Sequence, residues 1–171
     1  MRALTIIFVL CFYSVLSYSR DGFNGASLER TQSNGHYDAK GWSVNYLARQ
    51  SLMTVYAGYQ WLRLDPVTPD PLIDERINLS GFQAGMLIHP DFEVVRPYLG
   101  VGTFFGEDRQ CSSSEANCVN NGVFAIYPEA GIEFDLGSAV SITAKARWYE
   151  FNDQAYQDER LLSISIAYFI D

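Results

Sequence analysis

The sequence has few of the residues on which metal sites, hydrolytic enzymes and nucleic-acid-binding domains depend. It contains two histidines and three cysteines in 171 residues, and its formal net charge is −8 at pH 7. Because a nucleic-acid partner needs a basic surface, this excess of negative charge argues against one. Beyond the N-terminus, no apolar run is long enough for a spanning helix and no segment has a helical 3.6-residue period. The sequence therefore excludes a helical membrane protein and leaves strands as its main structural element.

The first nineteen residues have the layout of a secretory signal peptide. A positive start at Arg2 precedes an apolar run over residues 3–16, and Ser17 and Ser19 are small residues at the two positions that a signal peptidase reads. The alternative, a membrane-anchoring helix, fits less well because the run is shorter than the roughly 20 residues needed to span and lacks a basic flank. We therefore expect residues 1–19 to be a signal peptide. Residues 20–171 would then form one domain, and the loss of Arg2 would change the net charge to −9.

The segment from Asn121 to Phe151 alternates between apolar and charged residues with the period of a β-strand. It reads as two strands joined by a turn at residues 137–139. One face carries Phe124, Ile126, Pro128, Ala130, Ile132, Phe134, Ile142, Ala144, Ala146 and Trp148, and the other carries Tyr127, Glu129, Glu133, Lys145, Arg147 and Tyr149. The apolar face is continuous, whereas the charged face is balanced in sign. This pattern indicates a barrel with hydrocarbon outside and a buried ionic network inside.

Eight segments of about ten residues or more share this strand-like character. They lie near residues 22–31, 38–48, 52–63, 76–88, 92–106, 121–136, 140–151 and 160–170. Tight turns at residues 49–51, 89–91 and 137–139 alternate with longer polar connections at residues 32–37, 64–75, 107–120 and 152–159. Short turns at one end and long loops at the other are typical of outer-membrane barrels. The sequence thus predicts an all-β fold, an eight-stranded antiparallel up-and-down transmembrane β-barrel with both termini on the periplasmic side.

Three details of this prediction need the structure. The inward face of the first strand, near residues 22–31, is ambiguous. Pro97 and Pro128 fall inside strands, where proline cannot donate a ladder hydrogen bond, so we expect bulges or offset pairing near a barrel end. Cys111 and Cys118 stand close together in a polar segment of an exported chain, which predicts a disulfide that closes a loop. A metal site at these two cysteines is the less favoured reading because no histidine is near.

Two short motifs connect the chain with a known superfamily. The sequence Arg96-Pro97-Tyr98-Leu99-Gly100-Val101-Gly102 resembles a strand common in small OmpA/OmpX-like outer-membrane barrels, and Tyr127-Pro128-Glu129-Ala130-Gly131-Ile132 resembles the strand that follows it there. The last strand, residues 161–171, is similar to the terminal strand that the barrel-assembly machinery recognises, although it ends on Asp171 and not on an aromatic residue. The resemblance implies insertion into the outer membrane of a Gram-negative bacterium, among its lipids and lipopolysaccharide.

The interior of such a barrel is the first candidate site. An eight-stranded barrel is only wide enough for side chains to fill it, which argues against a general diffusion pore. We expect an interior charge network of Arg96, Glu129, Glu133, Lys145 and Arg147, because an unpaired charge in this place would be costly. The favoured interpretation is a packed polar plug, and the alternative is a narrow ion-conducting path. Neither interpretation requires a cofactor or a metal ion.

The loops and the histidines give the other functional hypotheses. His36, with Ser33 and Asp38, is the one combination that could suggest a lipid-modifying hydrolase or acyltransferase, because His89 is expected at the opposite end. Loop polarity explains this cluster equally well, so we expect no enzyme. The acidic loops at residues 64–75 and 107–120 could bind an extracellular ligand, or they could simply be solvated. We expect a structural or surface-interaction role of the adhesion type.

Overall fold

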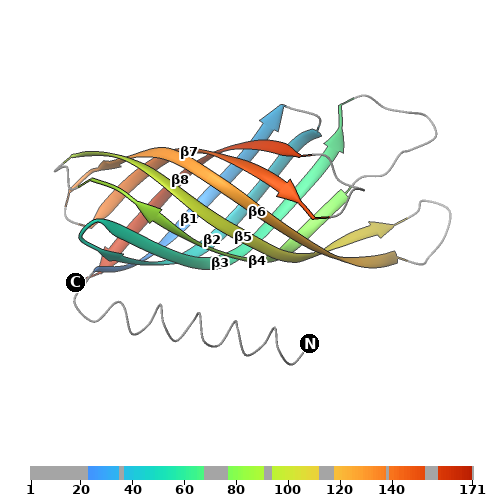
Figure 1. The fold of residues 1–171 in the computed structure, drawn as a ribbon, viewed down its shortest axis with the longest axis horizontal. Coiled ribbons are helices and arrows are strands. Elements are labelled where there is room, and N and C mark those ends of the chain that lie inside the picture. The colour runs from blue at the N-terminus through green and yellow to red at the C-terminus, as the bar shows by residue number, and fades with distance from the viewer. Residues whose placement is uncertain are drawn as a thin grey trace.

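The computed structural model contains eight β-strands that wind around a common axis (Figure 1). It describes residues 23–34, 37–67, 77–90, 94–111, 118–137, 139–152 and 158–170, without the side chains of residues 34, 66, 109–111 and 118–120. The strands are β1 (Phe23–Asn34), β2 (Tyr37–Gln50), β3 (Met53–Pro66), β4 (Ile77–Ile88), β5 (Val95–Cys111), β6 (Cys118–Asp135), β7 (Val140–Phe151) and β8 (Glu159–Ile170). Within the described residues, no helix is both long and apolar enough to cross a membrane.

The strands form one closed barrel in sequence order, and every pair of neighbours is antiparallel. The start of β1 pairs with the end of β8, for example Asn24 with Ile170, and this pairing closes the sheet. The predicted fold class is therefore confirmed. The start of β1 and the end of β8 lie on the same side of the barrel as the short connections (Figure 1). We call this side the turn end and the opposite side the loop end.

Side chains along each strand alternate between the barrel interior and its outer surface. Outward residues of the middle band are large, apolar and exposed, as at Leu99 and Ile164, which are 69% and 64% exposed. Inward residues of the same band are polar and buried, including Gln60, Gln83 and Thr143. In β1 the inward residues are Ser27, Glu29, Thr31 and Ser33, which settles the face of this strand. A polar interior inside an apolar surface is the arrangement of a barrel that stands in hydrocarbon.

This arrangement reverses at the loop end. There most of the buried inward residues are apolar, namely Ala39, Leu62, Leu64, Ile77, Leu79, Val123 and Leu161, and the polar ones include Ser33, Asp108 and Glu159. The outward positions beside them carry exposed polar or charged residues such as Lys40, Arg63, Asn78 and Arg160. Apolar residues inside and charged residues outside are what a barrel needs in water. The strands therefore continue beyond the hydrocarbon as a packed extension.

Several predicted boundaries and loops were wrong. The first long loop, residues 32–37, is mostly strand, because β1 ends at Asn34 and β2 begins at Tyr37. The predicted loop at residues 107–120 is also mostly strand, and Asp108 is fully buried inside the barrel. The β5–β6 ladder runs to Cys111 and Cys118, past the last pairs that β4 and β7 make at Asp108 and Ala125. This hairpin therefore projects beyond its neighbours (Figure 1).

The two prolines behave differently. Pro97 pairs with β6 only, because β4 begins to pair with β5 at Leu99, so its missing donor faces no neighbour. This is the expected offset pairing near a barrel end. Pro128 lies in the middle of β6, where the β6–β7 ladder is interrupted but its register does not shift. The expected bulge is therefore absent at Pro128, and the cost of the proline is a local gap in the ladder.

The remaining expectations about chain ends and loops lie outside the described residues. They include the signal peptide at residues 1–19, His36, and most of the acidic loop at residues 64–75. Cys111 and Cys118 are register partners at the tip of the β5–β6 hairpin, which is compatible with the Cα separation of about 4.4–6.8 Å that a disulfide spans. Their side chains are not among those described, so the structure does not support the bond and it stays a prediction.

Candidate functional site in the barrel interior

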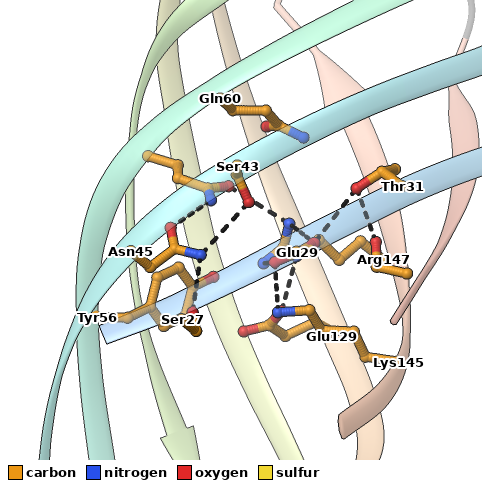
Figure 2. Close-up of polar contacts among 12 residues, drawn as sticks. Ser27, Glu29, Thr31, Ser43, Asn45, Tyr56, Gln60, Glu129, Lys145 and Arg147 are labelled. Atoms are coloured by element: carbon orange, nitrogen blue, oxygen red, sulfur yellow. Dashed lines mark hydrogen bonds and ion pairs between the residues drawn. The ribbon is translucent and has the colours of Figure 1, made fainter. Parts of the chain in front are cut away.

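A buried ion network occupies the middle of the barrel. The Arg147 guanidinium on β7 lies between two carboxylates: its Nε donates to Glu129 Oε2 at 2.8 Å, and its Nη1 donates to Glu29 Oε1 at 2.8 Å. Lys145 Nζ lies 2.7 Å from Glu29 Oε2. Figure 2 shows these side chains converging from β1, β6 and β7. Two cations therefore balance two anions in this central network, formed by Glu29, Glu129, Lys145 and Arg147.

A layer of amides and hydroxyls surrounds the central network. Gln83 accepts from Arg147 Nη1 at 3.3 Å and donates to Asn45 Oδ1 at 2.6 Å, so the network continues to β2 and β4. Thr31 contacts Glu29 at 3.3 Å and Ser163 at 2.9 Å. These groups add hydrogen bonds to Arg147 and Glu29 and so hold the two charges in a fixed arrangement, whereas Glu129 Oε1 has no hydrogen-bond partner among the described residues.

Aromatic residues complete the cross-section toward the loop end. The hydroxyl of Tyr56 donates to that of Tyr127 at 3.0 Å, and Tyr149 donates to Gln60 at 2.8 Å. The rings of Tyr127 and Tyr149 stack with centroids 4.5 Å apart. Inward glycines provide the space for such rings, since a Cβ at Gly85 would lie 2.5 Å from the Tyr56 hydroxyl. Rings from three strands therefore fill the lumen above the ions.

A second ion network lies at the turn end. Arg49 Nη2 on β2 contacts both carboxylate oxygens of Glu133, at 2.5 and 2.6 Å, and its guanidinium lies 4.0 Å from the centre of the Phe169 ring. Arg96 on β5 pairs with Asp135 and lies 3.5 Å from Glu133. This turn-end network, formed by Arg49, Arg96, Glu133 and Asp135, is also balanced in sign.

His89 follows β4 and packs beside the turn-end network. Its Nε2 lies 3.1 Å from Thr54 Oγ1, and the residue is buried. Burial, together with the nearby positive charge of Arg49, lowers the pKa of the His89 imidazole below its usual value. A neutral His89 therefore adds no charge to a cluster that is already balanced.

The structure divides the five residues proposed from sequence between these two networks. Glu129, Lys145 and Arg147 belong to the central network, and Arg96 and Glu133 belong to the turn-end network. Sequence reasoning missed Glu29, Arg49 and Asp135. Asp135 follows Glu133 by two residues, so its inward position could have been found from alternation. Arg49 was assigned to a turn, but β2 continues to Gln50 and includes it.

These layers close the lumen. The side chains of Glu29 and Arg147 are 0% exposed, and Gln60, Gln83, Tyr127, Tyr149 and Glu129 are also buried. They come from five of the eight strands, β1, β3, β4, β6 and β7, so they meet across the barrel and do not line one wall. Most of these ions and amides bond to one another, although some buried polar atoms, including Gln60 Nε2 and Glu129 Oε1, have no hydrogen-bond partner among the described residues. The interior therefore has the character of a packed polar plug.

Comparison with known structures identifies the fold. The N-terminal β-barrel domain of OprF from Pseudomonas aeruginosa matches with a TM-score of 0.58 and 13% identity, over 88% of this chain and 100% of that chain. The attachment invasion locus protein Ail of Yersinia pestis matches with a TM-score of 0.58 and 16% identity, over 87% and 99%. Neisserial surface protein A matches with a TM-score of 0.56 and 14% identity, over 86% and 95%. The fold is that of a small eight-stranded outer-membrane β-barrel. No protein-family model and no curated protein sequence matches this barrel.

The hydrolase candidates of this outer-membrane barrel do not come together among the described residues. Ser33 Oγ donates to Glu159 Oε1 at 2.5 Å inside the barrel, whereas Asp38 pairs with Lys40 at 2.7 Å on the outer surface. His89 is at the turn end, far along the strands from both. Within the described ranges, no group of three or more histidines, cysteines and acidic residues could hold a metal ion.

Proposed function

We propose that this protein is an outer-membrane barrel without a large pore, whose role is structural or surface-interactive. One observation carries the proposal: Arg147, fully buried between Glu29 and Glu129, joins β1, β6 and β7 across the lumen. A barrel closed in this way cannot serve as a general diffusion channel. What it can do is hold loops in fixed positions above a membrane, which is where binding functions of rigid scaffolds lie.

The loop end supports an interaction role. Its apolar interior makes the strand ends a packed extension, and the β5–β6 hairpin continues past Asp108 and Ala125 with ladder partners only in its own two strands. A surface presented on ordered strands loses less conformational entropy on binding than a free loop does. Ail, named as an attachment invasion locus protein, uses the same fold at 16% identity. That likeness supports the scaffold and leaves the ligand open.

Shortening the hairpin tests the interaction role. Residues 109–120 would be replaced by a two-residue Asn-Gly turn, which joins Asp108 to Asn121 at the last level where β4 pairs with β5. Adherence of bacteria that express the full chain would be compared with adherence of bacteria that express the shortened chain, at equal surface amounts. We expect adherence to fall while the barrel keeps its heat-modifiable migration in detergent gels. Equal adherence would contradict a role for the hairpin. In a control variant the order of residues 112–117 is scrambled. This variant distinguishes an effect of the hairpin's sequence on adherence from an effect of its length.

The outer-membrane location has its own test. We expect the protein in the outer-membrane fraction and soluble only with detergent. A monomer that is soluble without detergent would contradict the location.

We further propose that the barrel is not an enzyme. The alternative, a lipid-modifying hydrolase or acyltransferase, would depend on His36. Lipid A extracted from expressing cells should therefore have the same mass spectrum with the wild-type chain and with His36→Ala. A mass change that His36→Ala abolishes would establish the enzyme instead.

A further inference from the structure

The outward faces of β2 and β3 carry three matched rows of side chains at the loop end. Counted from the hydrocarbon outward, the register partners are Trp42 with Trp61, then Lys40 with Arg63, then Asp38 with Asp65. All of these residues point away from the barrel interior by strand alternation. An aromatic row, a cationic row and an acidic row thus follow one another along the same strand pair.

The cationic row is unusual because it places like charges directly opposite each other. Such cross-strand pairs are destabilising when nothing lies between them. The ion pairs instead run along each strand, with Lys40 2.7 Å from Asp38 and Arg63 2.9 Å from Asp65. Exposed pairs of this kind contribute little to stability. The pairing therefore does not by itself explain why two cations stand side by side at this level.

A third cation joins them from β1. Arg30 points outward, is the register partner of Trp42, and has its guanidinium carbon 5.6 Å from the centre of that ring. Its partner on the other side is the exposed Ile164 of β8. None of the ion pairs found among the described side chains includes Arg30. An arginine at the edge of the hydrocarbon band, beside tryptophan and without an ion pair to a described carboxylate, calls for an anion from outside the protein.

We propose that Arg30, Lys40 and Arg63, the outward cation cluster, bind the phosphate groups of a phosphorylated glycolipid in the leaflet at the loop end. The tryptophans mark the boundary of the hydrocarbon, and lipid phosphates lie just beyond it, at the level of the cluster. Arginine guanidinium groups match the geometry of phosphate oxygens. The acidic row further out repels anions that approach from water, so the cluster favours a phosphate that is fixed in the membrane plane.

A lipid titration tests this inference, which rests on the proposed membrane location. The purified full chain would be placed in phosphocholine-detergent micelles and titrated with diphosphoryl lipid A. Intrinsic fluorescence would report binding, because two of the three tryptophans of the chain border the cluster. Each cation near a lipid surface changes affinity about fivefold, so Lys40→Gln/Arg63→Gln should weaken binding about 25-fold. Asp38→Asn should strengthen it.

Controls distinguish the sources of phosphate and the location. Arg160→Gln, outward on β8 opposite Trp148, removes a charge outside the cluster and should leave affinity within about twofold, below the effect expected for one cluster cation. Equal affinity of Lys40→Gln/Arg63→Gln and wild type would overturn the proposal. The proposal would also be overturned if phosphatidylglycerol at matched charge bound as tightly as lipid A, or if free inorganic phosphate saturated the fluorescence change. A chain that stays soluble without detergent would instead refute the location.

Discussion

The central ion network predicts a large penalty for neutralising Glu29. This carboxylate contacts Lys145 Nζ at 2.7 Å and two nitrogens of Arg147 at 2.8 and 3.2 Å, and it is fully buried. The substitution Glu29→Gln keeps the shape but leaves one net positive charge in the barrel interior. Removal of one partner of a buried pair typically costs about 3–5 kcal/mol, because the other charge stays buried without compensation.

Reversible unfolding in urea from lipid vesicles measures this penalty, with gel mobility and tryptophan fluorescence as signals. With a slope of about 2 kcal/mol per M, the urea midpoint should fall by roughly 1.5–2.5 M. A matched control is Asp38→Asn, which neutralises the partner of Lys40 on the outer surface and should cost at most about 1 kcal/mol. The double variant Glu29→Gln/Lys145→Gln restores charge balance, so it should lose less stability than the sum of the single variants. If Glu29→Gln shifted the midpoint no more than Asp38→Asn does, the interior charges would be hydrated and the plug would be wrong.

Three further predictions concern packing, pH and the membrane face. A Cβ at Gly131 would lie 2.6 Å from the Tyr98 hydroxyl and 2.7 Å from the Ala144 carbonyl oxygen, so Gly131→Ala should lower the free energy of unfolding by about 1–3 kcal/mol. A Cβ at Gly122 meets nothing within 4 Å, so Gly122→Ala should be nearly neutral. Equal urea midpoints of the two variants would refute this packing. Because the pKa of His89 is lowered in the folded state, the unfolded chain binds the proton first as the pH drops, and stability should fall below about pH 6.5. His89→Asn should flatten this dependence of stability on pH, and an unchanged pH profile of the variant would contradict the prediction. Ile164 lies exposed in the middle of β8, on the face that we expect to contact lipid. Ile164→Arg should lower the free energy of unfolding in vesicles by about 2–4 kcal/mol, and no loss of stability would place this face in water.

The sequence was sufficient to predict much of the fold. The strict alternation in residues 121–151 and in the last strand could be read without tertiary information, because one face is charged and the other is not. The register of the β6–β7 hairpin follows from its short turn, where Gly137 has a φ of 131° that favours glycine, and this register places Glu129 opposite Arg147. Local pattern and turn geometry therefore determine half of the central network.

The other half depends on closure of the barrel. In β1 both faces carry a charge, Glu29 on one and Arg30 on the other, so alternation alone could not decide which points inward. Only the pairing of β1 with β8 brings Glu29 beside Arg147, a residue 118 positions away. The apolar interior of the loop end was missed for a related reason. Leu62 and Leu64 continue the inward face of β3. The expectation that inward residues are polar holds only where the outer surface contacts hydrocarbon, and these two leucines lie beyond that level.

The most direct test of a sealed interior is single-channel recording with the purified wild-type chain in a planar bilayer. Glu29, Glu129, Lys145 and Arg147 bond to one another across the lumen, and the tyrosines above them fill the remaining cross-section. We therefore predict a silent baseline without reproducible unitary steps at moderate voltage. Steady steps of one fixed conductance, altered in size by Glu29→Gln, would contradict the plug and establish an ion path through the central network.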